Sequence, residues 1–250
     1  MQNQLFRHII CVTIASLILS ACASSGIVPK ATIDSKANDQ WNKIIESVPQ
    51  SQNAQLVRAV QQITVNLLAA AGENPAEWRI AIFEAPDTFN AFALPNKRIG
   101  VFTGLINNVD NADQLAAVIG HEIAHVELSH VEARVNRAVA PNVLIGVAKL
   151  PGQVLGVPVV KQAGDVVGGV VSAGAVLPYN RNQEIEADTV GVEYAFKAGY
   201  DPRQAAELWR KVSEAQGHAN RMTPEFLSTH PSSEHRIREL DKAVDELLGQ

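Results

Sequence analysis

Apolar positions along the chain mostly follow a helical period, and one short region has the pattern of strands. Residues 39–71 carry apolar side chains spaced by three and four, which predicts helices, and Pro49 divides them into two. The run at residues 78–83 predicts a strand, and residues 90–94 and 98–103 predict two more strands joined by a tight turn. The pattern therefore indicates a small sheet within a mostly helical fold.

A second group of helices follows the strands. The first is predicted over residues 111 to about 131, where Asn111 can cap the amino end and Gln114 can complete a capping box. The others are predicted over residues 184–198, 201–217 and 234–248. Gly199 follows the second of these helices, as glycine often does at a helix end.

The amino terminus has the pattern of a secretory signal. Arg7 precedes an apolar run at residues 9–19, which is too short for a confident membrane span. The sequence Leu19-Ser20-Ala21-Cys22 then resembles the lipoprotein box of bacteria, in which the cysteine is lipidated. The alternative is an ordinary signal with a chance cysteine.

These features predict three parts of the chain. Residues 1–21 are expected to be a lipoprotein signal peptide, residues 22–36 a tether that starts at the lipidated Cys22, and residues 37–250 the folded domain. Several acyl chains hold a protein at a bilayer far better than one. By the same resemblance, Ala23 after the cysteine favours the periplasmic face of the outer membrane.

Composition narrows the class of protein. The 250 residues are 46% hydrophobic and 19% charged, which is typical of a globular chain. The formal net charge of −5 argues against a nucleic-acid partner. The two cysteines, Cys11 and Cys22, both lie near the amino terminus, which excludes a disulfide framework.

The strongest chemical signal is an HExxH motif, His121-Glu122-Ile123-Ala124-His125, inside a predicted helix. The two histidines are one turn apart, so both imidazoles leave the same face and can bind one tetrahedral zinc ion. Glu122 lies about 100° round the helix, close enough to reach a water molecule at that ion.

A catalytic zinc site needs a third protein ligand. Glu184 is the preferred candidate, because Asp188 shares its helix face and can accept the outer N–H of a ligand histidine. Glu186 is the competing ligand but lies about 200° away from Glu184. On one continuous helix His130 would point about 180° away from His121, which indicates a structural or surface residue.

The pair of motifs, His121–His125 followed by Glu184-x-x-Ala187-Asp188, resembles the CaaX-prenyl-protease-like zinc metallopeptidases, peptidase family M48. The resemblance spans about residues 40–240. The bacterial members of this family include BepA- and LoiP-like proteins, and its mitochondrial members are the Oma-type proteases. This chain looks like the periplasmic, lipid-anchored branch. Further segments that look like family signatures are Phe92–Asn96, Thr103–Leu105, Leu115–Gly120, Arg181, Ala198–Pro202 and Ser228–Pro231.

The resemblance implies an α+β, zincin-like (gluzincin) fold with a small antiparallel sheet beside the HExxH helix. It implies one zinc ion per chain, with Glu122 carrying protons. It leaves three roles open for His230: an oxyanion donor, a reversible extra zinc ligand, or a turn histidine. Arg181 is expected either to hold the helix of Glu184 or to bind substrate. Phe92 and Leu94 either flank the substrate cleft or belong to the core.

The predicted function is that of a zinc endopeptidase that cleaves misfolded or stalled envelope proteins at the outer membrane. The alternative is a chaperone-like assembly factor with little proteolysis. Residues 141–178, rich in Val, Gly and Ala, are read either as a packed helical hairpin or as a lid or membrane-facing segment beside the active site.

Overall fold

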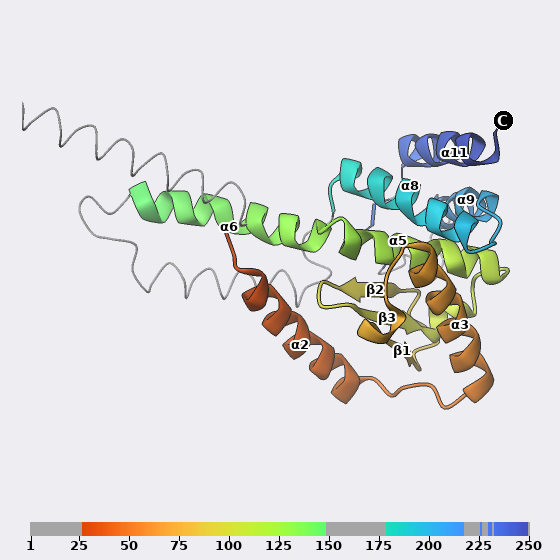
Figure 1. Cartoon of the computed structure of the whole chain (residues 1–250), viewed down its shortest axis with the longest axis horizontal. Helices are drawn as coiled ribbons and strands as arrows, with labels where there is room; N and C mark the ends of the chain where they lie inside the picture. Colours follow the sequence, from red (N-terminus) through yellow and green to blue (C-terminus); the bar gives the residue numbers. More distant parts are fainter. Residues whose placement is uncertain (1–26, 149–178, 218–225, 227–229, 232, 250) are drawn as a thin grey trace, which may run out of the picture.

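The computed structural model describes residues 27–148, 179–217, 226, 230, 231 and 233–249, with backbone only at 140–148 and 215–217. The helices, shown in Figure 1, are α2 Lys30–Ser47, α3 Ala54–Ala70, α4 Thr103–Ile106, α5 Ala112–Glu127, α6 His130–Ala148, α8 Arg181–Lys197, α9 Arg203–Gly217 and α11 Glu234–Leu248. The 3-10 turn η1 spans Pro75–Glu77, and the strands are β1 Arg79–Phe83, β2 Ala91–Leu94 and β3 Arg98–Phe102. The predicted mostly helical α+β fold is confirmed.

The sheet is mixed, whereas the sequence analysis expects an antiparallel sheet. Its strand order is β1-β3-β2, with β1 parallel to β3 and β2 antiparallel to β3. The predicted strand pair β2–β3 is confirmed, and Lys97 in its turn adopts a left-handed φ of 61°. The chain runs from β1 to the far side of β3, makes β2 there and returns as β3, so the two outer strands run in opposite directions. β2 is therefore an edge strand.

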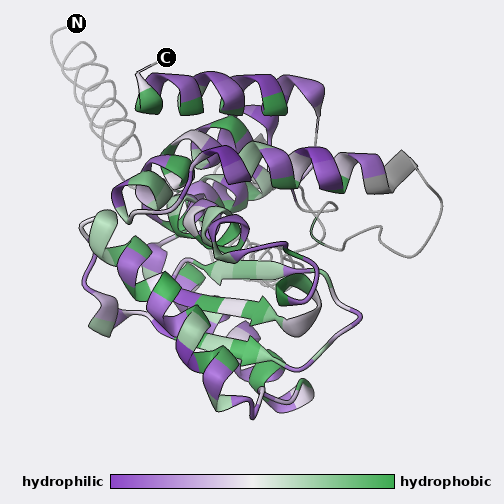
Figure 2. Ribbon diagram, turned by 90° about the vertical axis from the view of Figure 1, so that its right-hand side faces the viewer, coloured by the Kyte–Doolittle hydropathy of each residue, from purple (hydrophilic) through white to green (hydrophobic). Residues whose placement is uncertain are grey.

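Helix α5 lies between the sheet and the group formed by α8, α9 and α11 (Figure 1). Figure 2 shows that hydrophobic residues dominate the strands and the inward faces of the helices around them. The main core joins α3, the sheet, α5 and the carboxyl-terminal helices. Its fully buried members include Leu67, Leu68, Ile99, Leu105, Ile119, Ile123 and Leu240. The helix that carries the HExxH motif is therefore packed on both sides.

A second core cluster places α2 against β1, β2 and α6. The Trp41 ring lies 6.0 Å from the Phe83 ring and 6.3 Å from the Phe92 ring, both edge-on. Ile33 is 1% exposed in the same cluster. Residues 30–36 therefore belong to the folded unit, whereas the sequence analysis placed them in the tether.

Helices α5 and α8 cross at two glycines. A Cβ on Gly120 would lie 2.7 Å from the Gly191 carbonyl oxygen, and a Cβ on Gly191 would lie 2.6 Å from the His121 nitrogen. Real Cβ atoms do not approach this closely, so both positions require glycine for this crossing. The absence of a side chain at position 191 thus lets the two metal-motif helices touch.

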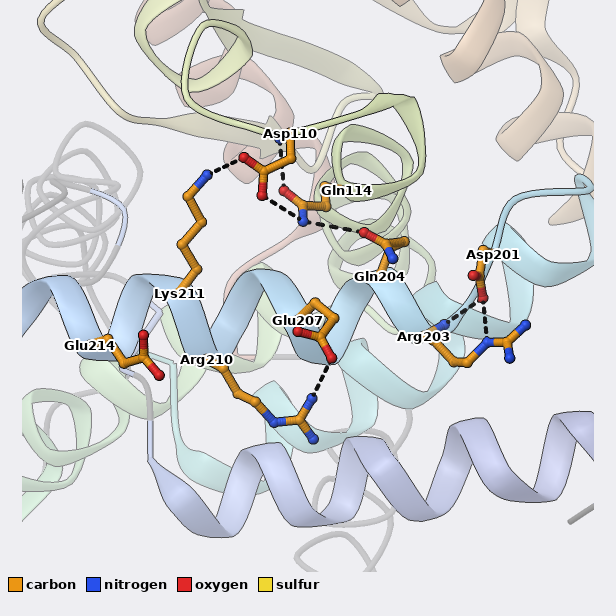
Figure 3. A pocket seen from close by; sticks show the side chains of 9 residues that line it. All are labelled: Asp110, Gln114, Asp201, Arg203, Gln204, Glu207, Arg210, Lys211 and Glu214. Atoms are coloured by element: carbon orange, nitrogen blue, oxygen red, sulfur yellow. Dashed lines mark hydrogen bonds and ion pairs between the residues drawn. The ribbon is translucent and has the colours of Figure 1, made fainter.

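The amino end of α5 is fixed by polar contacts. Asn111 caps the helix by accepting a hydrogen bond from the Gln114 N–H at 2.9 Å, as predicted. The Gln114 side chain accepts from the Asp110 N–H and reaches Gln204 on α9 (Figure 3). Lys211 of α9 lies 2.5 Å from the Asp110 carboxylate. This network lines a polar groove and holds α9 against the start of the HExxH helix.

The predicted helix over residues 111–131 is two helices. α5 ends at Glu127, Ser129 takes a left-handed φ of 54°, and α6 begins at His130. This backbone conformation could not be predicted from the serine, because left-handed conformations are uncommon outside Gly, Asn and Asp. The break turns the chain back and changes the surroundings of His130.

The other predicted helices are confirmed at α2, α3, α8, α9 and α11, with a break after Ser47 that separates α2 from α3 at Pro49. Among the described residues, no helix is long and apolar enough to cross a membrane. The lipoprotein box with Cys22 and most of the 141–178 segment lie outside the described residues.

Candidate metal centre

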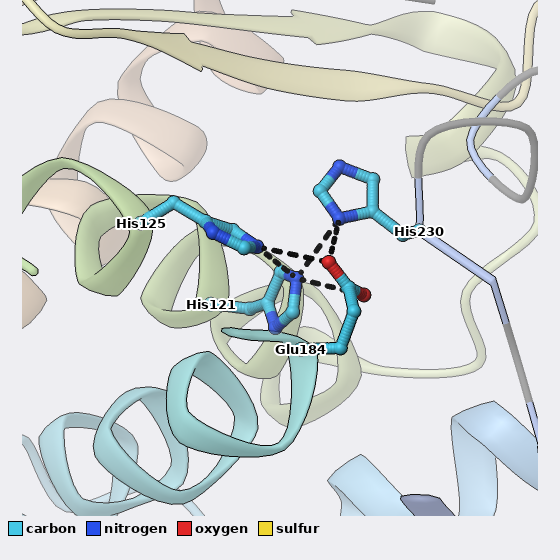
Figure 4. Close-up of side chains that lie close together, drawn as sticks. All are labelled: His121, His125, Glu184 and His230. Carbon is cyan, nitrogen blue, oxygen red and sulfur yellow. Dashed lines mark hydrogen bonds and ion pairs between the residues drawn. The ribbon is translucent and has the colours of Figure 1, made fainter. Parts of the chain in front are cut away.

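Four buried side chains bring their donor atoms together beside α5 (Figure 4). His121 and His125 come from α5, Glu184 from the first turn of α8, and His230 from the segment before α11. One donor atom from each lies within 4.8 Å of all the others. All four residues are at most 3% exposed.

The separations fit a single tetrahedral ion. The Nε2 atoms of His121 and His125 are 3.0 Å apart, and His230 Nδ1 is 3.1 Å from His121 Nε2. Glu184 Oε1 lies 3.3 Å from His125 Nε2 and 3.1 Å from His230 Nδ1. Zinc bonds of about 2.0–2.1 Å place tetrahedral ligands about 3.3 Å apart. Three imidazoles and one carboxylate are also a donor set that zinc prefers.

The outer nitrogens of the two α5 histidines are also held. His121 Nδ1 lies 2.9 Å from Asp188 Oδ1, so Asp188 occupies the place that the sequence analysis gave it. His125 Nδ1 lies 2.9 Å from His130 Nδ1. His130 is 4% exposed, so it is neither a surface residue nor directed away from the motif. The predicted outward direction of His130 is wrong because the helix is not continuous: the left-handed Ser129 separates α5 from α6.

Glu122 is held at the edge strand of the sheet. Its Oε2 accepts a hydrogen bond from the Ala93 N–H of β2 at 2.9 Å. Its Oε1 lies 3.3 Å from His230 Nε2 and accepts no hydrogen bond of good geometry from the described residues. One carboxylate oxygen thus faces the donor cluster and remains available for a proton.

Burial and neighbouring charges set the protonation of these groups. Burial raises the pKa of Glu122 above its ordinary value, against the opposing effect of His230 and His121, which suits a proton acceptor. Burial alone would also raise the pKa of Glu184, but the charges of His230 and Arg236 hold it well below its usual range. Burial keeps the pKa of His125 well below its usual range, so this imidazole is neutral, as a ligand must be.

Arg236, in the first turn of α11, is a residue of the site that the sequence analysis missed. Its guanidinium makes a bidentate ion pair with Asp188, and its Nη1 lies 2.5 Å from Glu184 Oε2. The same guanidinium covers the Trp209 ring at 3.9 Å. Removing one partner of a buried ion pair typically costs about 3–5 kcal/mol, so Arg236 ties α11 firmly to α8. The sequence contains a signal for this role: Arg236 lies on the same helix face as the buried Leu240 and interrupts an apolar stripe. A charged residue at such a position needs a buried partner.

Arg181 is not part of the cluster. It is exposed at the first position of α8 and, within the described residues, makes no ion pair with the four donors. It lines a cavity of about 230 Å³ together with Glu184, Pro231 and Arg236. The predicted role of holding the Glu184 helix is performed by Arg236 instead.

Of the two alternatives for Phe92 and Leu94, the described residues favour packing: Leu94 is a member of the second core cluster, and the partly buried Phe92 packs against it. Leu94 is 7% exposed within the second core cluster. The Phe92 ring packs among Trp41, Phe83 and Phe102 at centroid distances of 6.0–6.3 Å. Their place in β2 therefore serves packing on the face opposite α5.

The sequence of this chain also matches a family of known proteins. Residues 50–244 match the model of peptidase family M48. The chain belongs to peptidase family M48. It is 31% identical over 189 residues to the mitochondrial metalloendopeptidase OMA1 of Schizosaccharomyces pombe, covering 75% of this chain and 52% of the relative. It is 30% identical over 201 residues to the human mitochondrial metalloendopeptidase OMA1, covering 76% and 37%.

A bacterial relative is also similar. The chain is 27% identical over 166 residues to the beta-barrel assembly-enhancing protease of Yersinia pestis, covering 64% of this chain and 33% of that protein. The M48 chain described here thus spans about half or less of the length of these relatives.

Proposed function

We propose that this M48 protein is a zinc-dependent endopeptidase. The observation that carries the proposal is the buried cluster of His121, His125, Glu184 and His230, whose donor separations fit one tetrahedral zinc ion. Glu122 next to it supplies the proton-transfer group that hydrolysis requires. The relatives named as metalloendopeptidases support the same chemistry.

Each residue has a defined part in the proposed reaction. His121, His125 and Glu184 would hold the ion, and Asp188 would orient His121. Bound there, zinc supplies Lewis acidity that polarises a peptide carbonyl and lowers the pKa of water. Glu122 accepts the proton of the attacking water on its free oxygen and then delivers it to the leaving amine nitrogen.

His230 gives the centre a closed form. A catalytic zinc site keeps one position open, whereas here four protein donors converge. Of the three roles that the sequence leaves open for His230, its Nδ1 position among the donors favours the reversible fourth ligand. In this proposal the closed form is less active than the form in which His230 has left the other three donors.

The substrate would bind as an added strand. β2 is the edge strand of the sheet, and its Ala93 N–H is bonded to Glu122. An extended peptide that pairs with β2 brings its backbone to Glu122, and recognition through backbone bonds suits unfolded chains of varied sequence.

We further propose that the protein acts at the bacterial outer membrane, anchored by a lipid on Cys22 and facing the periplasm. The signal-like run at residues 9–19 and the lipoprotein-like box support this location. The similarity to a relative named a beta-barrel assembly-enhancing protease supports misfolded or stalled envelope proteins as substrates. The similarity to mitochondrial relatives bears on the chemistry and not on this location.

The decisive experiment compares wild-type protein with Glu122→Gln. Both are expected to bind about one zinc ion per chain by elemental analysis. Casein cleavage should fall about 10²–10⁴-fold in the variant, because only the proton carrier is lost. Glu127→Gln is the matched control, since it makes the same change on an exposed residue of the same helix and should leave cleavage unchanged.

Other outcomes separate the alternatives. Equal cleavage by wild type and Glu122→Gln would reject the role of Glu122. The chaperone-like function would be indicated by three results together. The wild type binds zinc and prevents aggregation of an unfolded substrate, and His230→Ala, in which the centre is open, still cleaves nothing.

A further inference from the structure

The Nδ1 atoms of His121 and His125, which point away from the donor cluster, contact different kinds of side chain. The Nδ1 of His121 faces a carboxylate, Asp188, at 2.9 Å. The Nδ1 of His125 faces another imidazole nitrogen, His130 Nδ1, also at 2.9 Å. His130 Nε2 in turn lies 3.3 Å from Glu186 Oε2. A continuous path of polar contacts therefore runs from His125 to the surface of α8.

His130 is held in place independently of its ring. The left-handed Ser129 turns the chain sharply between α5 and α6, which brings His130 back toward His125. The Gln183 side chain of α8 donates a hydrogen bond to the His130 carbonyl at 3.3 Å. The Tyr179 ring stacks on the His125 ring at a centroid distance of 3.9 Å and lies 6.3 Å from the His130 ring. The buried ring thus has a defined position against His125.

The contact between two Nδ1 atoms fixes where the protons lie. His125 offers Nε2 to the donor cluster, so its single ring proton must be on Nδ1. The opposing His130 Nδ1 must then accept, because two N–H groups cannot face each other at 2.9 Å. A neutral His130 carries its own proton on Nε2, where it can donate to the Glu186 carboxylate. All three contacts are satisfied by this one arrangement.

We propose that His130, oriented by Glu186, is a positioning residue that fixes the tautomer and ring orientation of the metal ligand His125. The inference rests on the proposed metal centre. It assigns to a neutral imidazole the task that a carboxylate performs for His121. It also gives Glu186, which the sequence analysis considered as a rival metal ligand, a different part in the same site.

The test uses two replacements of nearly identical shape. In His130→Asn the side-chain oxygen can occupy the place of Nδ1 and accept from His125, whereas His130→Leu offers no acceptor. Zinc affinity is measured by competition with a chromophoric chelator, with the Tm of the metal-free proteins as a folding control. We expect His130→Leu to lose about 10–100-fold in zinc affinity and His130→Asn to recover most of this loss.

A milder pair of variants keeps the core intact. Glu186→Ala removes the outer carboxylate, and Glu193→Ala removes an exposed carboxylate of the same helix that pairs only with Lys197 among the described ion pairs. Both change the net charge by the same amount. Zinc affinity should fall several-fold more in Glu186→Ala than in Glu193→Ala.

The outcomes are separable. Equal losses in His130→Asn and His130→Leu would show that His130 only fills space, and no loss in either would remove its role. Equal affinities of Glu186→Ala and Glu193→Ala would exclude Glu186 from the path. If wild-type protein itself bound no zinc, the proposed function would fail, whereas stoichiometric binding with unaffected variants would reject this inference alone.

Discussion

His230 differs from the other three donors because it lies outside regular secondary structure. Its backbone N–H bonds to the Phe226 carbonyl at 2.9 Å, and its ring stacks on Phe226 at 4.4 Å. Its carbonyl accepts a hydrogen bond from Arg236 at 3.4 Å. Of the four donors, His230 is thus the one that no described helix carries, which suits a reversible ligand.

The first prediction concerns this residue. His230→Ala should retain zinc, because three protein ligands remain, and should cleave casein faster than wild type, because the fourth position is open. Zinc content and initial rates are measured together. A fall in turnover of roughly 100-fold with zinc intact would instead identify His230 as an oxyanion donor. Identical rates would leave it a turn histidine.

Glu127, at the end of α5, interacts with the carboxyl group of Glu73. The Glu73 carboxylate is held in its charged form by Lys97, whose Nζ lies 2.6 Å away. Partial burial and the Glu73 charge raise the pKa of Glu127 to about 6. The folded protein therefore keeps this proton over a range of pH in which the unfolded chain loses it.

The second prediction follows from that difference. A carboxyl group with a raised pKa stabilises the fold when protonated, so its contribution is lost as pH rises from about 4.5 to about 6. Glu127→Gln, which cannot ionise, should flatten the decline of Tm over this range in zinc-saturated protein, by at most about 2–4 °C for so exposed a group. An unchanged slope in Glu127→Gln would show that this carboxyl group does not contribute to the decline.

At the scale of elements, the crossing of α5 and α8 determines whether a metal centre exists. These helices carry three of the four donors, and Gly120 and Gly191 bring their backbones into contact. Arg236 then clamps α11 onto α8 through Asp188 and Glu184. The centre is thus formed by helices whose separation is set by the absence of two side chains.

The third prediction tests this crossing. Gly191→Ala would place a methyl group 2.6 Å from the His121 nitrogen, so the helices must separate. We expect a loss of about 1–3 kcal/mol in stability, a Tm lower by about 2–12 °C, and weaker zinc binding. Thr189→Ala, on the exposed face of α8, is the control. An unchanged Tm and zinc affinity in Gly191→Ala would show that the crossing tolerates a side chain.

For the whole molecule, the described fold begins before the metal motif. α2 packs across the sheet and α6 through Ile33 and Trp41, so the chain between the proposed lipid anchor and the domain is shorter than residues 22–36. A short connection would keep the centre close to the bilayer surface.

The fourth prediction addresses the anchor. Cys22→Ala should move most of the protein from the membrane fraction to the soluble fraction, because acyl chains supply the membrane affinity. Membranes are separated by ultracentrifugation after expression in a bacterium. A variant that remains with the membrane would assign anchoring to the 141–178 segment. Ser24→Ala, close to the box but outside it, should remain membrane-bound like wild type.

Features that depend on local geometry could be predicted from the amino-acid sequence. Helical periodicity places His121 and His125 on one face, and it places Glu184 and Asp188 on one face of another helix. The cap at Asn111 and the β2–β3 hairpin follow from short-range chemistry in the same way. In each case the partners lie within a few residues, so the backbone alone fixes their relation.

The remaining features depend on contacts between distant parts of the chain. His230 meets His121 across 109 residues and Arg236 reaches it across 115, and such contacts depend on how whole helices pack. The parallel pairing of β1 with β3 depends on the path of the chain and not on the strand pattern. His130 lies only five residues from His125, yet its contact required a left-handed Ser129. A single backbone angle that the residue type does not specify redirected every side chain after it.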